Sequence, residues 1–457
     1  MLRIKPNGRL GRIFYDPDVK MILVIFAPIF IDMILNNLIS TVHSYLVAAV
    51  GEEAISGIGL VGTINSILTI LFAKLPSAVT ILVSQYRGAN NENGARKCVS
   101  QSTVMVTVFA TVIMAVMLLF PDQLFNIFFS KVEPGVLAEG KKYLFYSALS
   151  MPFFGIFQTG ACTCRGYGNN KIPLFTSVSG SVIDVVLSFI FIIPLRMGVA
   201  GAGISLLIAR IARAASVMFL VYKNNWFCTL DQLIHIDWKC LGAIAKLGLL
   251  SSSESLIVNF GATLKMRYIV EAGTAHITAN SIHNTFFTLV AVPISALATV
   301  AITLTGRYIG AGEKNETRVI IKKILYITTA IYGFMMLCAL ILFPHLYKLY
   351  TDNAETLALL NKMMVIHIIM MVIANPFVNI ITNAFKGAGD AWYCTVISVI
   401  CMWVVNVGLG IFLAADFGLG LGVIGSLISG NASVIVKSII YFFRFRTDKW
   451  MKKKLVE

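Results

Sequence analysis

Three acidic residues lie inside long apolar stretches, where a carboxylate has no water to solvate it. Asp32 stands in "PIFIDMILNN", Asp184 in "SVIDVVLS" and Glu254 in "SSSESLIV". An ionisable group deep in a bilayer costs at least about 2.5 kcal/mol by insertion scales, so it is expected to face a cavity or a partner. Desolvation favours the protonated form of a carboxylate. These residues therefore predict either an ion-exchange site within a membrane or acids that are satisfied by neighbours and lock helices together.

Other polar residues share the same apolar stretches. Ser188 lies one helical turn beyond Asp184, and His43 follows Asp32 within the same stretch. We assign ion coupling to these four residues. Polar side chains on membrane helices also hold helices together by hydrogen bonds, which is the alternative interpretation. We expect the remaining polar positions to bind a small-molecule substrate, and these are Glu254, Asn37, Gln158, Asn259, Asn280, Asn284, Asn375, Asn379 and Asn406.

The composition indicates an all-α integral membrane protein. Of 457 residues, 57% are hydrophobic and only 13% are charged, whereas soluble domains have about a quarter of their residues charged. Apolar runs of about 20 residues, enough for a helix to cross a bilayer, recur along the chain. We expect twelve spans, at 19–47, 54–85, 97–120, 137–163, 172–194, 199–222, 241–269, 274–306, 318–343, 357–385, 391–415 and 419–443.

The second half of the sequence repeats the first at an offset of 222 residues. At this offset Asp32 aligns with Glu254, His43 with Lys265, and Asp184 with Asn406. Six spans per half give both halves the same orientation in the membrane. We therefore predict five parts: an N-terminal arm, an N-lobe, a linker, a C-lobe and a basic tail, at residues 1–18, 19–222, 223–240, 241–443 and 444–457.

The net charge of +15 invites a nucleic-acid interpretation, but the charge distribution favours another. Lysine and arginine gather at both termini and in alternate loops, as the positive-inside rule requires of a plasma-membrane protein with both termini in the cytoplasm. We expect membrane lipid as a partner, no nucleic acid, and a monomer. The tail "RFRTDKWMKKK" is expected to anchor to anionic lipid.

No enzymatic motif stands out in the sequence. Gly57–Gly62 and Gly420–Gly425 fit the G-x-G-x-x-G pattern, but both lie in apolar helices and therefore indicate close helix packing. There is no Walker A motif and no Ser/His/Asp or metal-ligand constellation. We expect a protein that is not an enzyme and has no cofactor apart from H⁺ or Na⁺ as a coupling ion.

Several motifs resemble those of the multidrug and toxic compound extrusion (MATE) transporters. "CRGYGNNKIP" and "FKGAGDA" resemble the loop that closes spans 4 and 10 in that family, and "LVSQYRGAN", "LTGRYIGAG" and "MGVAGAGIS" resemble other family segments. The resemblance implies two six-helix bundles that form a V-shaped cleft. It also implies export of organic cations or drugs, driven by inward Na⁺ or H⁺.

The sequence departs from the family pattern at the coupling positions. His43 stands where the family has an aspartate, and Asp184 is displaced by one helical turn. These changes disfavour a family-type Na⁺ site and favour H⁺. We also expect Asp32 and Glu254 to face each other across the cleft, with at least one of them protonated at neutral pH.

The favoured function is therefore a secondary antiporter of organic, cationic or amphipathic solutes. The alternatives are a flippase for lipids or lipid-linked oligosaccharides, and a membrane scaffold. A flippase would hold its anionic cargo with cations. Lys265, Arg267 and His43 are expected to snorkel at outer helix ends, whereas the sequence leaves open whether Lys74, Arg210 and Arg213 face the cleft.

Overall fold

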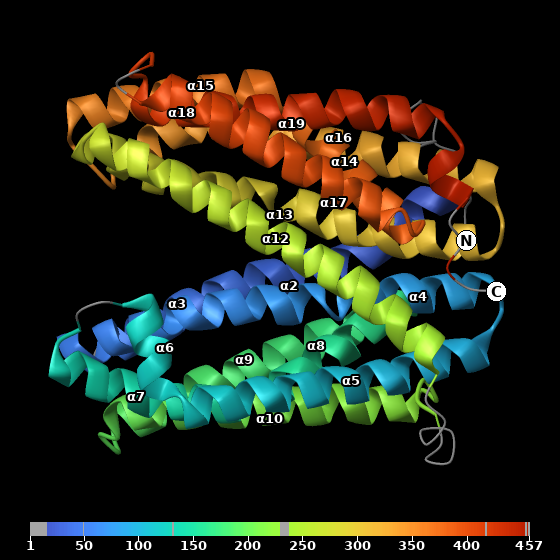
Figure 1. The fold of residues 1–457 in the computed structure, drawn as a ribbon, viewed down its shortest axis with the longest axis horizontal. Coiled ribbons are helices and arrows are strands. Elements are labelled where there is room, and N and C mark those ends of the chain that lie inside the picture. The colour runs from blue at the N-terminus through green and yellow to red at the C-terminus, as the bar shows by residue number, and fades with distance from the viewer. Residues whose placement is uncertain are drawn as a thin grey trace, which may run out of the picture. The chain divides into compact units, whose positions relative to one another are not determined.

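The computed structural model describes residues 16–48, 50–129, 132–228, 237–415, 418–452 and 455. Almost all of the ordered structure is helical (Figure 1). Most of the predicted N-terminal arm, the centre of the linker and the last residues of the tail lie outside the described residues. The helices are α2 (Pro17–Ala48), α3 (Glu52–Lys74), α4 (Ser77–Gly88), α5 (Glu92–Leu119), α6 (Pro121–Phe128), α7 (Pro134–Leu149), α8 (Met151–Gly166), α9 (Lys171–Ile192), α10 (Gly198–Lys223), α12 (Trp238–Glu271), α13 (Thr274–Gly310), α14 (Lys314–Tyr347), α15 (Ala354–Met371), α16 (Ala374–Gly387), α17 (Ala391–Ile400), the π-helix η1 (Cys401–Leu409), α18 (Gly410–Ala414), α19 (Gly422–Arg446) and the 3₁₀-helix η2 (Lys449–Lys452).

The all-α membrane fold predicted from composition is confirmed. Eleven helical stretches among the described residues are long and apolar enough to cross a membrane. The expected fourth span appears instead as α7 and α8, which meet at Ser150 and are 16 residues each. The expected tenth span is likewise divided, into α15 and α16. Each division precedes a proline, Pro152 or Pro376, whose missing N–H is best tolerated in the first turn of a helix.

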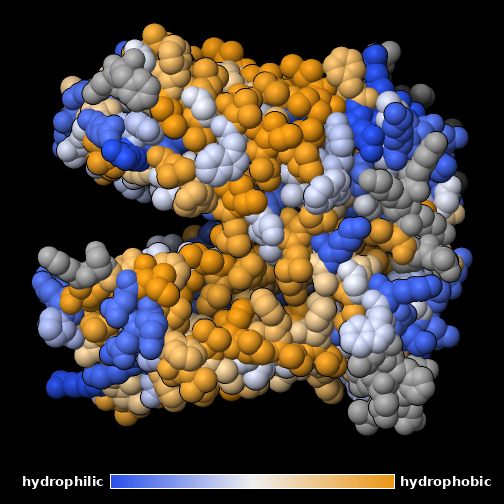
Figure 2. All heavy atoms as spheres, in the orientation of Figure 1, coloured by the Kyte–Doolittle hydropathy of each residue, from blue (hydrophilic) through white to orange (hydrophobic). Residues whose placement is uncertain are grey.

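The chain divides into two compact units. The N-terminal unit comprises Ala27–Ser252, and the C-terminal unit comprises Met1–Phe26 together with Ser253–Leu455. Both boundaries fall inside a long helix, α2 or α12, and therefore not in a loop. The first helix of each half thus contributes residues to both units. In each unit, hydrophobic residues run along the sides of the helices while hydrophilic residues gather at their ends (Figure 2).

The N-terminal unit is held together by close contact between helices. Its apolar core includes Phe72, Val106 and Met151, from α3, α5 and α8. A β-carbon placed on Gly57 of α3 would lie only 2.7 Å from the backbone nitrogen of Gly140 on α7. The role in helix packing expected of the first glycine-rich segment is therefore confirmed at Gly57, whereas Gly59 and Gly62 have no neighbouring atom within 4 Å of their β-carbon positions. In the C-terminal unit, Gly425 plays the same part, with its β-carbon position 2.6 Å from the Leu413 carbonyl oxygen.

The beginning of α2 packs on the C-terminal unit through ion pairs. The Lys323 ammonium of α14 lies 2.7 Å from the Asp16 carboxylate and 2.6 Å from the Asp18 carboxylate. The hydrogen bond from Lys323 lowers the pKa of the Asp16 carboxyl below its ordinary value. These contacts explain why the first residues of α2 belong to a different unit from the rest of that helix.

The described part of the basic tail docks on the protein itself. Trp450 of η2 is fully buried, and its ring stacks on Phe445 at a centroid distance of 5.6 Å. Arg444 donates to the buried Asp390 carboxylate at 2.8 Å, and Arg318 pairs with Asp448 at the same distance. The expectation of a tail that serves only as a lipid anchor is thus incomplete, because an aromatic side chain and two ion pairs fix residues 444–451 to the C-terminal unit.

Candidate functional site

In the N-terminal unit, Asp32 belongs to a hydrogen-bond network of amide, hydroxyl and guanidinium groups. The Asn36 amide nitrogen, one turn along α2, donates to Asp32 Oδ1 at 2.6 Å and to the Ser177 hydroxyl at 2.9 Å. The Ser181 hydroxyl donates to Asn36 Oδ1 at 3.1 Å and accepts a hydrogen bond of 2.7 Å from Arg213 of α10. Asp32 therefore belongs to a network that joins α2, α9 and α10.

His43 and Asp184 come together further along the same helices. His43 Nε2 lies 4.0 Å from Asp184 Oδ1, and the two side chains are 19% and 14% exposed. This distance is too long for a hydrogen bond. Both atoms are buried and have no hydrogen-bond partner among the residues that the structure describes. One added proton would therefore convert His43 and Asp184 into an imidazolium–carboxylate ion pair. It would join two atoms that have no hydrogen-bond partner among the described residues.

Two half-buried arginines of α10 contribute positive charge near Asp184. Both Arg210 and Arg213 interact electrostatically with its carboxylate. Arg210 also donates to the Ser150 hydroxyl, at the junction of α7 and α8, over 2.8 Å. Arg210 therefore lies inside the N-terminal unit, bonded to the break in the fourth span.

The other residues predicted in this half do not join the pair. The Ser188 hydroxyl lies 2.6 Å from that of Ser205 on α10, and among the described contacts it makes none with Asp184. Asn37 is exposed, and its side chain donates to the Met33 carbonyl of its own helix. Gln158 is half-buried on α8. Their predicted roles stay predictions.

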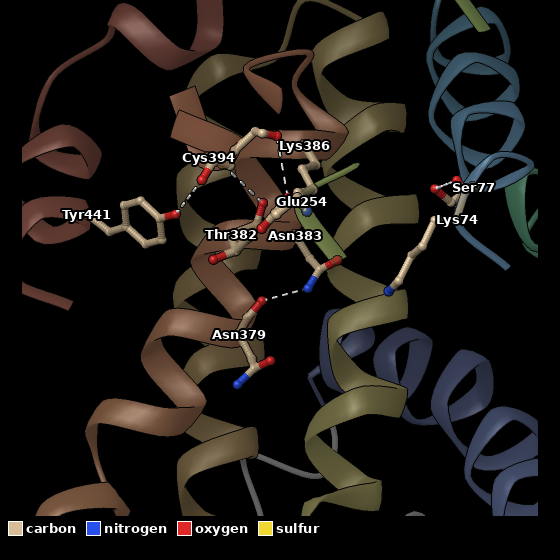
Figure 3. A network of polar contacts seen from close by, with 10 residues as sticks. Lys74, Ser77, Glu254, Asn379, Thr382, Asn383, Lys386, Cys394 and Tyr441 are labelled. Carbon is tan, nitrogen blue, oxygen red and sulfur yellow. Dashed lines mark hydrogen bonds and ion pairs between the residues drawn. The ribbon is translucent and has the colours of Figure 1, made fainter. Parts of the chain in front are cut away.

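In the C-terminal unit, Glu254 is paired with a cation. Lys386 Nζ lies 2.7 Å from Glu254 Oε2 (Figure 3). The Thr395 hydroxyl lies 3.4 Å from the same oxygen. Both charged side chains are largely buried, at 15% and 11% exposure. The last turn of α16 thus brings an ammonium to Glu254. The prediction that at least one of Asp32 and Glu254 is protonated at neutral pH stays a prediction. The predicted approach of Asp32 to Glu254 joins two different units and stays a prediction.

The asparagines of α16 form a connected stripe. The Asn379 side chain donates to Asn375 Oδ1 at 2.7 Å. The Asn383 side chain donates to the Asn379 carbonyl at 2.8 Å (Figure 3). Asn375 in turn donates to the Tyr332 hydroxyl of α14 at 3.1 Å. The stripe is partly buried, so its amides act as helix contacts as well as predicted cargo contacts.

Lys265 and Asn406 occupy the repeat positions of His43 and Asp184. Lys265 is buried and donates to the Ser426 carbonyl at 3.1 Å, so the expectation that it snorkels is wrong. Asn406 lies in the π-helix η1, and its Oδ1 is buried without a hydrogen-bond partner among the described residues. A β-carbon on Gly430 would lie 3.7 Å from Asn406 Oδ1 and 3.8 Å from Lys265 Nζ, so the two side chains converge there.

The remaining predicted residues lie apart from these clusters. Asn259 and Asn284 are exposed on their helices, and Asn280 contacts the Met266 sulfur at 3.6 Å. Arg267 is 79% exposed and pairs with Glu271, consistent with snorkelling. Lys74 is also exposed.

Sequence reasoning missed the approach of two histidines in the C-terminal unit. The rings of His283 on α13 and His367 on α15 lie 5.3 Å apart, and His283 stacks on Phe287 at 4.3 Å. The available signal was that His367 stands within an otherwise apolar run from Met363 to Met371.

The two units place equivalent residues in equivalent positions. Arg165 and Lys386 end the corresponding "RGYGN" and "KGAGD" helices. Each interacts with the acid of the first helix in its unit, Asp32 or Glu254. Further along the same helices, the N-terminal unit has His43 beside Asp184. The C-terminal unit has Lys265 and Asn406 at the equivalent positions of the repeat. Only the first of these pairs contains a carboxylate.

Comparison with known proteins places this arrangement among transporters. A family model described as MatE matches residues 28–190 and 251–412. The chain is 25% identical to "Uncharacterized transporter YisQ" of Bacillus subtilis over 93% of this chain and 94% of that protein. It is 21% identical to "Probable multidrug resistance protein NorM" of Thermotoga maritima, over 96% and 95%.

Solved structures share the fold. An outward-facing structure of a multidrug resistance MATE family transporter superposes with a TM-score of 0.85 at 20% identity, covering 97% of this chain and 99% of that chain. The Vibrio cholerae MATE transporter VcmN superposes with a TM-score of 0.87 at 18% identity, covering 96% and 98%.

Proposed function

The chain belongs to the MatE family of transporters, and from that premise we propose that it is a secondary antiporter. It exports organic, cationic or amphipathic solutes or drugs in exchange for H⁺ by alternating access. Relatives named as multidrug resistance proteins support the export of drugs. The asparagine stripe of α16 is the part of the C-terminal unit that would contact cargo.

The observation that supports H⁺ as the coupling ion is the His43–Asp184 pair. Its facing atoms lie 4.0 Å apart and lack hydrogen-bond partners among the described residues. A proton bound here would turn the pair into an imidazolium facing a carboxylate, with a strong interaction in a poorly solvated site. Sodium prefers several hard oxygen ligands, whereas the neighbours of Asp184 are an imidazole and two guanidinium groups.

Coupling follows from competition between two positive charges. A proton on the pair and a cationic solute repel each other, so binding of one favours release of the other. With alternating access, the proton enters from the outer side of the membrane and the solute is released to that same side. The N-terminal unit is expected to carry the proton because the equivalent pair in the other unit has no carboxylate.

Transport by inside-out vesicles tests the proposal. The vesicles contain the full chain, and uptake of an ethidium-type dye is measured while a pH gradient and a Na⁺ gradient are imposed separately. We expect uptake with an acidic lumen and no Na⁺ gradient. Vesicles with the Asp184→Asn variant should insert normally but fail to accumulate dye. Uptake driven only by Na⁺, or unchanged pH-driven uptake by the variant, would contradict the H⁺ proposal.

A lipid flippase is the second candidate because of two half-buried arginines of α10. Arg210 and Arg213 lie in the same cluster as Asp184, and cations of this kind suit an anionic headgroup. A fluorescent phosphatidylglycerol analogue in the same vesicles distinguishes the two functions. Flipping of the lipid without dye uptake would favour the flippase.

A further inference from the structure

Two cavities adjoin on the C-terminal unit, along α14, α16 and α19. The first has a volume of about 390 Å³ and combines basic with aromatic side chains; its lining includes Arg318, Lys322, Tyr326, Phe442, Phe445 and Arg446. The second, of about 450 Å³, is almost wholly apolar; its lining includes Ile369, Ile373, Phe377, Ile439, Phe442 and Phe443. Phe377 and Phe442 line both, so the two cavities are adjacent, and together they are called the groove.

The first cavity carries a surplus of positive charge. Three cationic side chains line it, and one of them, Arg318, is paired with Asp448 at 2.8 Å. Arg318 Nε is nevertheless buried without a hydrogen-bond partner among the described residues. The Arg446 guanidinium lies over the Phe442 ring at 4.6 Å, and Lys322 is exposed. Guanidinium and ammonium groups converging on one cavity are the usual partners of a phosphate group.

The second cavity continues the groove toward the interior of the membrane. Phe377 lies ten residues before the end of α16 at Gly387, which corresponds to a depth of about 15 Å at 1.5 Å per residue. Ile369 and Ile373, at the junction of α15 and α16, are 77% and 74% exposed. Such exposure of branched apolar residues beside a groove at this depth suits a hydrocarbon chain.

We propose that this groove binds an anionic phospholipid of the cytoplasmic leaflet. Its headgroup phosphate contacts Arg318, Lys322 and Arg446, and one acyl chain lies along the second cavity. Basic pockets between membrane helices on the cytoplasmic side suit such headgroups, and the positive-inside distribution places this end of α14 and α19 in the cytoplasm. A free phosphate would use the first cavity alone, whereas a lipid uses both.

The bound lipid also stabilises the docked tail. Phe445 lines the first cavity and stacks on the buried Trp450, while Arg318 donates to the Arg446 carbonyl at 3.2 Å. A phosphate in the cavity therefore reinforces the contacts that hold η2 in place. This inference does not depend on which solute the protein exports.

Retention of lipid by the purified full chain tests the proposal. Binding of phosphatidylglycerol and phosphatidylcholine in detergent is compared by native mass spectrometry, together with the midpoint of thermal unfolding. We expect preferential retention of phosphatidylglycerol and a higher midpoint in its presence. The double variant Lys322→Gln, Arg446→Gln should weaken phosphatidylglycerol binding by about 25-fold, from the usual contribution of two basic residues near an anionic surface.

Matched variants separate this site from general charge attraction. Lys348→Gln with Lys362→Gln removes the same charge from the other end of the C-terminal unit and should leave lipid binding unchanged. Ile373→Trp should reduce retention of the long-chain lipid by filling the second cavity. Equal retention of both lipids, equal loss in both double variants, or stabilisation by inorganic phosphate equal to that by lipid would each overturn the proposal.

Discussion

Asp32, Asp184 and Glu254 occupy similar apolar helices, but each meets different neighbours. Asp32 accepts a hydrogen bond from a neutral amide, and Glu254 lies 2.7 Å from an ammonium. Asp184 faces an imidazole at 4.0 Å. An ion pair already compensates the charge of Glu254, so a proton gains little there. A proton arriving at the pair with Asp184 would create a new ion pair, and on this ground we propose that the pair couples transport to H⁺.

A double-mutant cycle tests whether Glu254 and Lys386 form a structural lock. Removing one charge leaves the other buried and unpaired, so Glu254→Gln and Lys386→Gln should each destabilise the protein by roughly 3 kcal/mol. The double variant should recover much of that loss. The midpoint of thermal unfolding in detergent measures each step. Additive losses, with no recovery in the double variant, would show that the two residues do not stabilise each other.

At the scale of helices, packing in both halves depends on glycines at particular positions. Gly57 faces the backbone of α7, with a β-carbon position 2.9 Å from the Val136 carbonyl oxygen, whereas Gly59 faces open space. The two glycines lie two residues apart on one helix, in the same sequence motif. They therefore form a matched pair in which only contact across the helix interface differs.

Alanine substitution of these glycines separates packing from helix propensity. Gly57→Ala should destabilise the protein by about 1–3 kcal/mol, because its β-carbon overlaps backbone atoms that cannot move aside. Gly59→Ala should be neutral or slightly stabilising, since alanine favours helix over glycine. Thermal unfolding of both variants checks the difference. Equal midpoints would contradict the packing geometry of α3 against α7.

The π-helix η1 is the element that distinguishes the eleventh span from its repeat partner α9. Wide turns of this kind accommodate an inserted residue and often mark functional positions, and this one holds Asn406. Deleting Val404 should restore a regular helix, keep the fold and impair transport. The matched deletion of Val182 in α9 should disrupt folding, because α9 has no wide turn to absorb it. Full dye transport without Val404 would exclude a functional role for η1.

At the scale of the whole molecule, composition and the internal repeat predicted the membrane class and the helical fold. The family model matches twice, at positions 223 residues apart, close to the predicted offset of 222. The length of an apolar run and the spacing of a repeat depend only on the order of residues, so both can be determined from the sequence. The breaks at Ser150 and between α15 and α16 were missed, because an apolar run continues across each of them.

Partners of individual side chains were harder to predict. Lys386 was noticed only as part of a loop motif, yet it reaches a glutamate 132 residues away. Lys265 was expected at the surface but is buried against α19. Such pairings depend on how helices are packed, which the repeat constrains only between equivalent positions. The approach of His43 to Asp184 likewise appears only once α2 and α9 are placed.

Proton release on cargo binding tests the central claim most directly. The purified protein is mixed with a cationic dye in weakly buffered detergent solution, and the released protons are measured with a pH indicator. We predict that the parent releases about one proton for each dye bound. Asp184→Asn should bind the dye but release none, while Glu271→Gln, at an exposed pair, should behave like the parent. Equal proton release from Asp184→Asn and the parent would contradict coupling through the His43–Asp184 pair.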